Sequence, residues 1–201
     1  MNKVFLPWFT SLLLLISALV SSATLIEFDI SPTGSTAALG LSPENEIIPG
    51  SSRGSGNEIG GGIRFDTISR LLSFSIGYGS SAGFTDLTGA AFAFFLHGPA
   101  NPWETAPVLF DLAPFHTFAS DPAQGGLIVG SLTLGSQDAA SLLQGLDYIN
   151  IYTPANLGGE IRGQLIAVNA PVPDSGSGLF VLTAGLLGGL LALHWKRLPQ
   201  A

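Results

Sequence analysis

The stretch Leu142 to Leu165, LLQGLDYINIYTPANLGGEIRGQL, decides the fold of this chain. Residues 147–152 and 160–168 are rich in isoleucine, valine and tyrosine, a composition that is typical of strands. Residues 153–159 between them hold a proline, an asparagine and two glycines, which favours a hairpin-like loop. The stretch therefore predicts two consecutive strands that pair with each other.

One short helix is expected just before this hairpin, over residues 136–144. Ser136 suits the N-cap position, and Asp138 suits the first turn, where a negative charge meets the positive end of the helix dipole. Alanines and leucines fill the remaining positions, and Gly145 is placed to end the helix. We expect no second helix between the two ends of the chain.

Other short apolar or alternating segments predict further strands. They are residues 25–30, 36–41, 61–66, 71–78, 87–97, 107–112 and 127–134. Residues 90–96 are apolar throughout, which predicts a central strand buried on both faces, whereas 107–112 is expected at an edge. Residues 42–62 and 113–126 are expected to be loops. Short strands with glycine-rich turns predict an all-β sandwich or barrel.

The N-terminal residues 1–23 read as a secretory signal peptide. Lys3 supplies the positive charge, residues 8–20 form the apolar segment, and Ser21-Ser22-Ala23 offers small residues for cleavage. Cleavage between Ala23 and Thr24 would leave Thr24 as the first residue of the exported domain.

The C-terminal residues 178–195 read as a transmembrane helix. The run from Leu179 to Leu193 carries no charge and has no polar face, unlike the helices of soluble proteins. Lys196 and Arg197 begin a basic tail, residues 196–201, which is expected to stay in the cytoplasm. Residues 169–177 form a linker to the membrane, and this linker contains Val172, Pro173, Asp174, Ser175 and Gly176.

This pentapeptide, followed by an apolar helix and a basic cluster, resembles the VPDSG-CTERM sorting signal, a relative of the bacterial PEP-CTERM signals. The resemblance implies that an exosortase-type membrane protease cuts near the pentapeptide. The helix is then a transient anchor, and the domain passes through the secretion machinery across the inner membrane to the envelope or the extracellular matrix.

The charge distribution supports export and excludes nucleic acid as a partner. Four arginines against fourteen acidic residues give the chain between Thr24 and Gly178 a net charge of −10. Such a domain repels phosphate backbones. The chain has no cysteine, so neither a disulfide framework nor thiolate chemistry is available to it.

The domain between the ends, residues 24–168, resembles the chordin-type (CHRD) domain. Three blocks carry the resemblance: the segment around Asn45-Glu46-Ile47-Ile48-Pro49, the block Leu96-His97-Gly98-Pro99-Ala100, and the stretch from Leu142 to Leu165. The family implies an immunoglobulin-like or Greek-key β-sandwich, a secreted or envelope location, and no established activity. Its signature residues here, which we expect to be structural, are His97, Tyr152, Asn156, Gly159, Glu160, Arg162 and Gly163.

The chain departs from the family pattern at its histidines. Phe95 and Tyr152 stand where the family usually has two further histidines, so His97 is alone. Because one imidazole cannot form a zinc or copper site, we expect no metal and no cofactor. His97 is instead expected to hydrogen-bond into the Gly98-Pro99 turn that follows it.

Glu160 and Arg162 lie two residues apart, so their side chains share one face of the last strand. We expect an ion pair or hydrogen bonds that brace the turn, rather than a functional pair. Glu27 and Asp29 are expected on a solvated face of the first strand. Trp103 and Phe115 are expected in loops, where an aromatic side chain either anchors a ligand or packs on the sandwich.

Nothing in the sequence amounts to a catalytic set. Residues 50–54 and 79–83 match the Gly-x-Ser-x-Gly pattern of a nucleophile elbow, but neither precedes a helix, as a true elbow must. The sequence thus predicts a non-enzymatic envelope or matrix module. The alternatives are a protein that binds matrix polysaccharide and, less favoured, a metal-binding or redox sandwich protein.

Overall fold

The computed structural model describes residues 24–47 and 52–168. The signal peptide up to Ala23, the sorting motif from Val172 to Gly176 and the C-terminal helix at 178–195 lie outside these residues. Within the described part, no helix is long and apolar enough to cross a membrane.

The regular secondary structure of the described chain is almost entirely β-strand. Its strands are β1 (Leu25–Ile30), β2 (Gly56–Asp66), β3 (Leu71–Tyr78), β4 (Ala93–His97), β5 (Val108–Asp111), β6 (His116–Phe118), β7 (Gly126–Thr133), β8 (Tyr148–Thr153) and β9 (Asn156–Ala167). The single α-helix is α1 (Ser136–Leu143), and four short 3₁₀ turns lie at Pro43–Asn45, Ser80–Ala82, Ala113–Phe115 and Pro122–Gln124. The prediction of an all-β fold with one short helix is confirmed.

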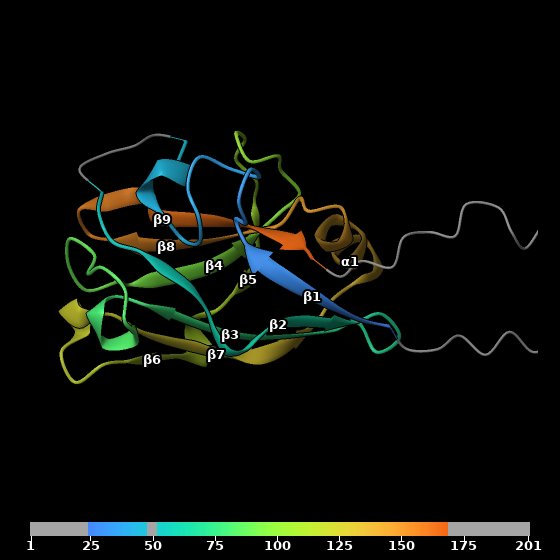
Figure 1. The fold of residues 1–201 in the computed structure, drawn as a ribbon, viewed down its shortest axis with the longest axis horizontal. Helices are drawn as coiled ribbons and strands as arrows, with labels where there is room; N and C mark the ends of the chain where they lie inside the picture. Colours follow the sequence, from blue (N-terminus) through green and yellow to red (C-terminus); the bar gives the residue numbers. More distant parts are fainter. Residues whose placement is uncertain (1–23, 48–51, 169–201) are drawn as a thin grey trace, which may run out of the picture.

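The strands form one antiparallel series in the order β5-β4-β8-β9-β1-β2-β3-β7-β6. This series folds into two layers, with β5, β4, β8 and β9 in one, β2, β3, β7 and β6 in the other, and β1 joining them (Figure 1). After β7 and α1 the chain returns to the first layer and places β8 beside β4.

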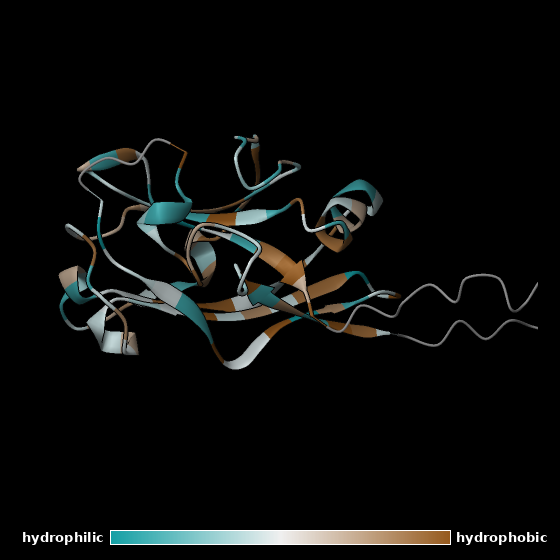
Figure 2. Ribbon diagram, turned by 45° about the horizontal axis from the view of Figure 1, so that its top comes forward, coloured by the Kyte–Doolittle hydropathy of each residue, from teal (hydrophilic) through white to brown (hydrophobic). Residues whose placement is uncertain are grey.

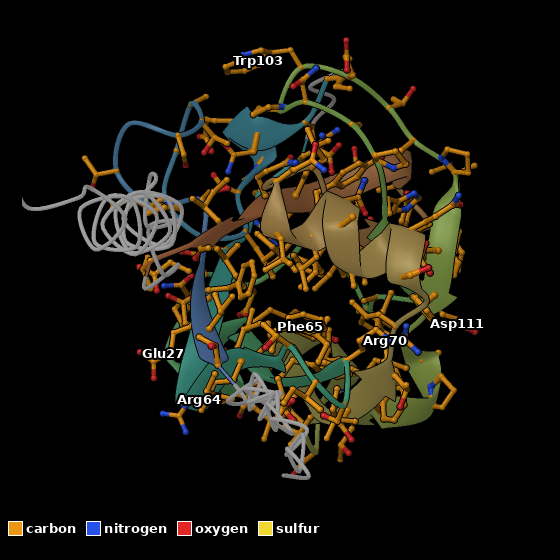
Figure 3. All side chains as sticks on the ribbon, turned by 90° about the vertical axis from the view of Figure 1, so that its right-hand side faces the viewer. Glu27, Arg64, Phe65, Arg70, Trp103 and Asp111 are labelled. Carbon is orange, nitrogen blue, oxygen red and sulfur yellow. The ribbon has the colours of Figure 1, made fainter. Side chains whose placement is uncertain are left out.

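The core lies between the two layers. Strand ribbons alternate between hydrophobic and hydrophilic residues (Figure 2), and the hydrophobic ones of both layers meet inside. Phe65 of β2 points into this space, whereas Glu27 and Arg64 lie on the outside (Figure 3). The Glu27 carboxylate and the Arg64 guanidinium form an exposed ion pair at 3.3 Å, as a solvated face requires.

Two predictions near the N-terminal side of the domain are wrong. Residues 36–41 are not a strand, because the Asn45 side chain bonds both the N–H and the carbonyl of Ala38 and the carbonyl of Gly40. Strand β2 begins at Gly56, inside the predicted loop, because Gly56 already pairs with Tyr78 of β3. The pairing continues past a register shift between Glu58 and Ile63. The glycines at this bulge, of which Gly60 has φ +53°, are the residues that predicted a loop in the sequence.

Other boundaries also differ. The strand predicted at 87–97 begins only at Ala93, lies next to the edge strand β5 rather than at the centre, and leaves Phe95 partly exposed. The predicted loop 113–126 contains β6, which pairs with β7. Strand β9 starts at Asn156, so the hairpin turn is shorter than predicted, and Gly135 rather than Ser136 occupies the N-cap of α1.

Candidate functional site

The outward side of β4, β8 and β9 is a layer of polar and aromatic side chains. Its members, which we call the outer polar face, are Phe95, His97, Tyr148, Asn150, Tyr152, Glu160, Arg162 and Gln164. The register places His97, Tyr148 and Gln164 side by side. Polar residues at alternate positions of a strand share one face, and such a face usually meets solvent. Glu160, Gln164 and Arg162 follow this pattern, yet they are only 0%, 1% and 2% exposed.

Arg162 is buried because it holds the loop that follows β4. Its Nη1 donates to the Glu104 carbonyl at 2.8 Å and its Nη2 to the Asn101 carbonyl at 3.3 Å. The guanidinium also lies 3.5 Å from the ring centroid of Tyr148, a cation–π contact. A planar cation with several donors is suited to tie two carbonyls of one loop to a strand.

His97 holds the same loop from its other side. Its Nδ1 is 2.9 Å from the Ala106 carbonyl, which can only accept, so Nδ1 carries the proton. Nε2, 2.9 Å from the Tyr152 hydroxyl, therefore accepts from that group. Burial lowers the pKa of His97 and favours this neutral form. The prediction that His97 hydrogen-bonds into the Gly98-Pro99 turn is wrong, because the loop folds back and places the Ala106 carbonyl beside Nδ1 instead.

Glu160 belongs to a separate cluster at the start of β9. Its carboxylate accepts from the Thr88 N–H and hydroxyl, each at 2.6 Å, from the Thr153 hydroxyl, and from the Asn156 amide at 2.9 Å. Burial alone would raise the pKa of Glu160, but these donors outweigh it and the pKa is lowered.

The predicted ion pair between Glu160 and Arg162 is therefore wrong, and Arg162 braces the loop at Asn101 and Glu104 rather than the hairpin turn. The two side chains share a face, as expected from their spacing, but each is satisfied by a different loop. Spacing in a strand fixes a side chain's face, and the loops that cover this face decide its partners.

The two signature glycines leave no room for side chains. A Cβ at Gly163 would come within 2.9 Å of the Gly40 carbonyl and would also overlap Ile30. A Cβ at Gly159, where φ is +121°, would overlap the Glu46 carboxylate and lie 2.5 Å from the Asn150 amide nitrogen. Gly159 thus brings the backbone directly against Asn150 of the outer polar face and Glu46 of the loop that covers it.

Beside Gly159 the outer polar face opens into a pocket of about 140 Å³. Its walls are Glu46, Ile47, His97, Thr105, Ala106, Tyr148, Asn150, Tyr152, Gly158 and Arg162. Glu46 is only 9% exposed and Asn150 only 3%, yet neither Glu46 Oε1 nor Asn150 Oδ1 has a hydrogen-bond partner among the described residues. Both oxygens are shielded from solvent and lie against Gly159, and the Asn150 amide acts on the Glu46 carboxyl. The pocket itself, walled by polar and aromatic side chains, is the candidate binding site.

Burial shifts the pKa values of two groups that line the pocket, Glu46 and Tyr152. Burial raises the pKa of Glu46 to about 7, although the nearby charge of Arg162 and the Asn150 amide act in the opposite direction. Burial likewise raises the pKa of Tyr152 to about 12. Groups with perturbed pKa values that line one concavity mark functional sites more often than chance.

Sequence reasoning missed Glu46, Tyr148 and Asn150 as site residues. Tyr148 and Asn150 had a signal, since they alternate with isoleucines on β8 and so share the face of Tyr152. Glu46 had none, because it lies in a loop 104 positions before Asn150 and only the tertiary fold brings the two together.

The remaining sequence candidates lie away from this pocket or inside the fold. Trp103 is 64% exposed and projects outward (Figure 3), whereas Phe115 packs edge-on against Phe74 at 5.4 Å. The 79–83 pattern forms a 3₁₀ turn rather than a strand-to-helix elbow. Across residues 24–47 and 52–168, no group of three or more His, Cys, Asp or Glu side chains is placed to hold a metal ion.

A third buried carboxyl lies just before β8. Asp147 is fully buried, and neither of its oxygens has a hydrogen-bond partner in the described chain; the Ser141 hydroxyl nearby donates to Asp138 O instead. Burial raises the pKa of Asp147 to about 6. Its contact with Gly98, where a Cβ would overlap the carboxylate, shows how tightly this end of β4 is packed.

Comparison with known proteins agrees with this architecture. Residues 38–165 match the family model of the CHRD domain, which covers more than half of the chain and all of the polar signature described above. Neither curated proteins nor solved structures give a match. The chain therefore belongs to the CHRD domain family.

Proposed function

We propose that the protein is an exported, non-enzymatic module of the cell envelope or extracellular matrix. The observation that carries this proposal is how the signature residues are used. Arg162, His97 and Glu160 direct their hydrogen bonds at loops of their own chain, so these polar groups stabilise a surface rather than activate a substrate.

Export and sorting are the second part of the proposal. The signal peptide up to Ala23 directs the chain to the secretion machinery, and the helix at 178–195 anchors it in the membrane. An exosortase-type protease then acts near Val172-Pro173-Asp174-Ser175-Gly176 and releases the domain to the envelope or matrix. The acidic, lysine-free segment between Thr24 and Gly178 supports this route, because it favours solubility outside the cell.

The intact mass of the protein recovered from cells tests both cleavages. We expect a mature form that begins at Thr24 and lacks the C-terminal helix. A double substitution, Pro173→Ala with Asp174→Ala, should keep the helix attached and leave the protein in the membrane fraction. Full-length protein confined to the cytoplasm would overturn the proposal.

Binding of a matrix polysaccharide is the second candidate function. The pocket beside Gly159 favours it, because this concavity is lined by polar and aromatic side chains. A metal-binding or redox role is less favoured, because both imidazole nitrogens of His97 are engaged by Ala106 and Tyr152.

A further inference from the structure

Both ends of the described chain leave the sandwich at the same place. The Thr24 N–H donates to the Thr67 hydroxyl at 3.2 Å, and the Thr67 N–H donates to the Thr24 carbonyl. At the other terminus, the Val168 N–H donates to the carbonyl of Glu27 in β1 at 2.9 Å. The chain therefore enters and leaves beside the turn between β2 and β3, residues 67–70, and α1 lies at the same end of the domain (Figure 1).

Exposed apolar side chains gather around this exit. Leu25 and Ile68 are more than half exposed, and Leu71 and Val168 are more than a third exposed. The register pairs Leu25 of β1 and Leu71 of β3 with the same residue of β2, so the two leucines lie on one outward face. Apolar side chains that are exposed together, rather than singly, mark a contact surface. We call the following residues the exit surface: Leu25, Ile68, Arg70, Leu71 and Val168.

The turn that carries Ile68 is held by hydrogen bonds. Asp66 Oδ1 accepts from the N–H groups of Ile68 and Ser69 at 2.9 and 2.8 Å. The Arg70 carbonyl accepts from the Leu134 N–H at 2.9 Å, and the Arg70 side chain is exposed at this end (Figure 3). A fixed apolar side chain beside an exposed cation suits the boundary between lipid headgroups and acyl chains.

We propose that the exit surface rests on the outer surface of the membrane while the chain is anchored. Ile68 and the two leucines reach the acyl boundary, and the Arg70 guanidinium binds a lipid phosphate. This inference rests on the proposed anchoring by residues 178–195, and it adds the orientation of the domain and the residues that touch lipid.

The length of the chain beyond Val168 makes the membrane the partner of this surface. Only residues 169–177 separate the domain from the apolar segment, and nine residues span at most about 30 Å. A tether this short gives an effective concentration in the millimolar range. Even a contact with a dissociation constant of about 1 mM is then formed for much of the time, whereas a free domain would not make it.

The charges at this end do not oppose the contact. The Asp66 carboxylate accepts from two backbone N–H groups, and Asp138 lies in the first turn of α1, where the helix dipole offsets its charge. Arg70 adds a positive charge that anionic lipids attract. Asp86 and Asp121 lie in the loops after β3 and before β7, at the opposite end, so this orientation keeps them away from the bilayer.

The experiment places one fluorescent label at either end of the domain. The chain has no cysteine, so Ser69→Cys and Ser120→Cys each give a single site, and both serines are exposed in loops at opposite ends. The full chain is reconstituted into vesicles of phosphatidylethanolamine and phosphatidylglycerol, in which some lipids carry a nitroxide quencher on the headgroup. We expect quenching at position 69 to exceed quenching at position 120 by about threefold or more.

Substitutions in the chain labelled at position 69 test the contact itself. Ile68→Asp should reduce the quenching by about half or more, because a carboxylate is costly at the acyl boundary. Leu157→Asp is the matched control, since Leu157 is also an exposed apolar residue but lies beside the β8–β9 turn at the opposite end. Arg70→Glu should also reduce the quenching, and more so with phosphatidylglycerol than in vesicles of phosphatidylcholine alone. Thermal melting curves should stay unchanged, because all three side chains are exposed.

Flotation of the vesicles separates the two ideas. If the protein floats with the vesicles but both labels are quenched equally, the anchor stands and the exit surface is wrong. If the protein does not float, the anchor and the contact are both wrong. Stronger quenching at position 120, or equal effects of Ile68→Asp and Leu157→Asp, would overturn the orientation.

Discussion

The inward and outward faces of the β4–β8–β9 layer are both buried, but by different means. On the inward face, Ile151 and Ile161 are fully buried among apolar side chains of the opposite layer. On the outward face, Arg162 and Glu160 are buried just as completely beneath loops to which they are hydrogen-bonded.

This difference affects how each face tolerates change. Apolar packing is non-directional, so the inward face can adjust to a smaller side chain at the cost of a cavity. A buried polar network is directional, and removal of one member leaves the others desolvated without partners. Substitution of one side chain on the outer polar face should therefore lower the free energy of unfolding more than substitution of one side chain on the inward face.

The largest effect is expected for Arg162→Met, which keeps much of the side-chain length and removes the guanidinium. The Glu104 carbonyl loses its guanidinium donor, the Asn101 carbonyl keeps only the Glu104 N–H, and the cation–π contact with Tyr148 is lost, so we expect a loss of about 3–5 kcal/mol in the free energy of unfolding. Urea denaturation measures it. Arg64→Met, which breaks the exposed pair with Glu27, is the control and should cost less than about 1 kcal/mol. Equal losses for both arginines would refute the idea of a buried network.

Ile161→Ala, one position before Arg162 on β9, tests the inward face. Removing three buried carbons should cost about 3 kcal/mol, through lost burial and the cavity that remains. The same denaturation experiment applies, with Leu157→Ala as a control because Leu157 is exposed. A cost for Ile161→Ala well above that of Arg162→Met would reverse the ranking of the two faces.

The pH dependence of stability should reveal Asp147. Its pKa rises from 3.8 in the unfolded chain to about 6 in the fold, so the protonated form is favoured on folding. The contribution of Asp147 to the free energy of unfolding is complete below pH 4 and is lost as the pH rises through 6. The free energy of unfolding should change by about 3 kcal/mol over this range. Thermal melts from pH 4 to pH 8 measure it.

Asp147→Asn should flatten this part of the profile, whereas Asp111→Asn, at an exposed position, should leave it intact.

Glu46, with a raised pKa of about 7, adds a further loss of stability as the pH rises through 7, and Glu46→Gln should remove that further loss. Glu160 acts in the opposite direction: its lowered pKa gives stability that is present above pH 4.5 and lost on further acidification. A profile that rises steadily from pH 5 to pH 8 would contradict the burial of Asp147 and Glu46.

The smallest effect is expected for Tyr152→Phe. This change removes the hydroxyl that donates to His97 Nε2 and leaves the ring in place, and we expect a loss of about 1 kcal/mol. Because the neutral form of His97 loses a bond in which it accepts, the pKa of His97 should rise. NMR titration of the imidazole in wild type and variant measures this shift, and an unchanged pKa would show that the Tyr152–His97 bond is not formed in solution.

The strands and the helix were largely readable from the sequence, because apolar periodicity and turn residues act locally. The alternation in 71–78 gave β3, residues 136–144 gave α1, and the stretch Leu142 to Leu165 gave β8 and β9 to within a few residues. Local signals failed where side-chain contacts or strand pairing overrode them. Asn45 takes the backbone groups of residues 38–40 away from a sheet, and the glycines at 60–62 form a bulge instead of a loop.

The sequence alone determined the all-β class and the family, because apolar alternation and the family's motif blocks are patterns of residues close together in the chain. It also determined that Glu160 and Arg162 share one strand face, because side chains of a strand alternate with period two. Only the tertiary structure decided that this face is covered by loops. It gave Glu160 and Arg162 separate partners and brought Glu46 against Asn150 across 104 positions of chain. Partners and pockets arise from contacts between segments distant in sequence, and no local pattern of residues encodes such contacts.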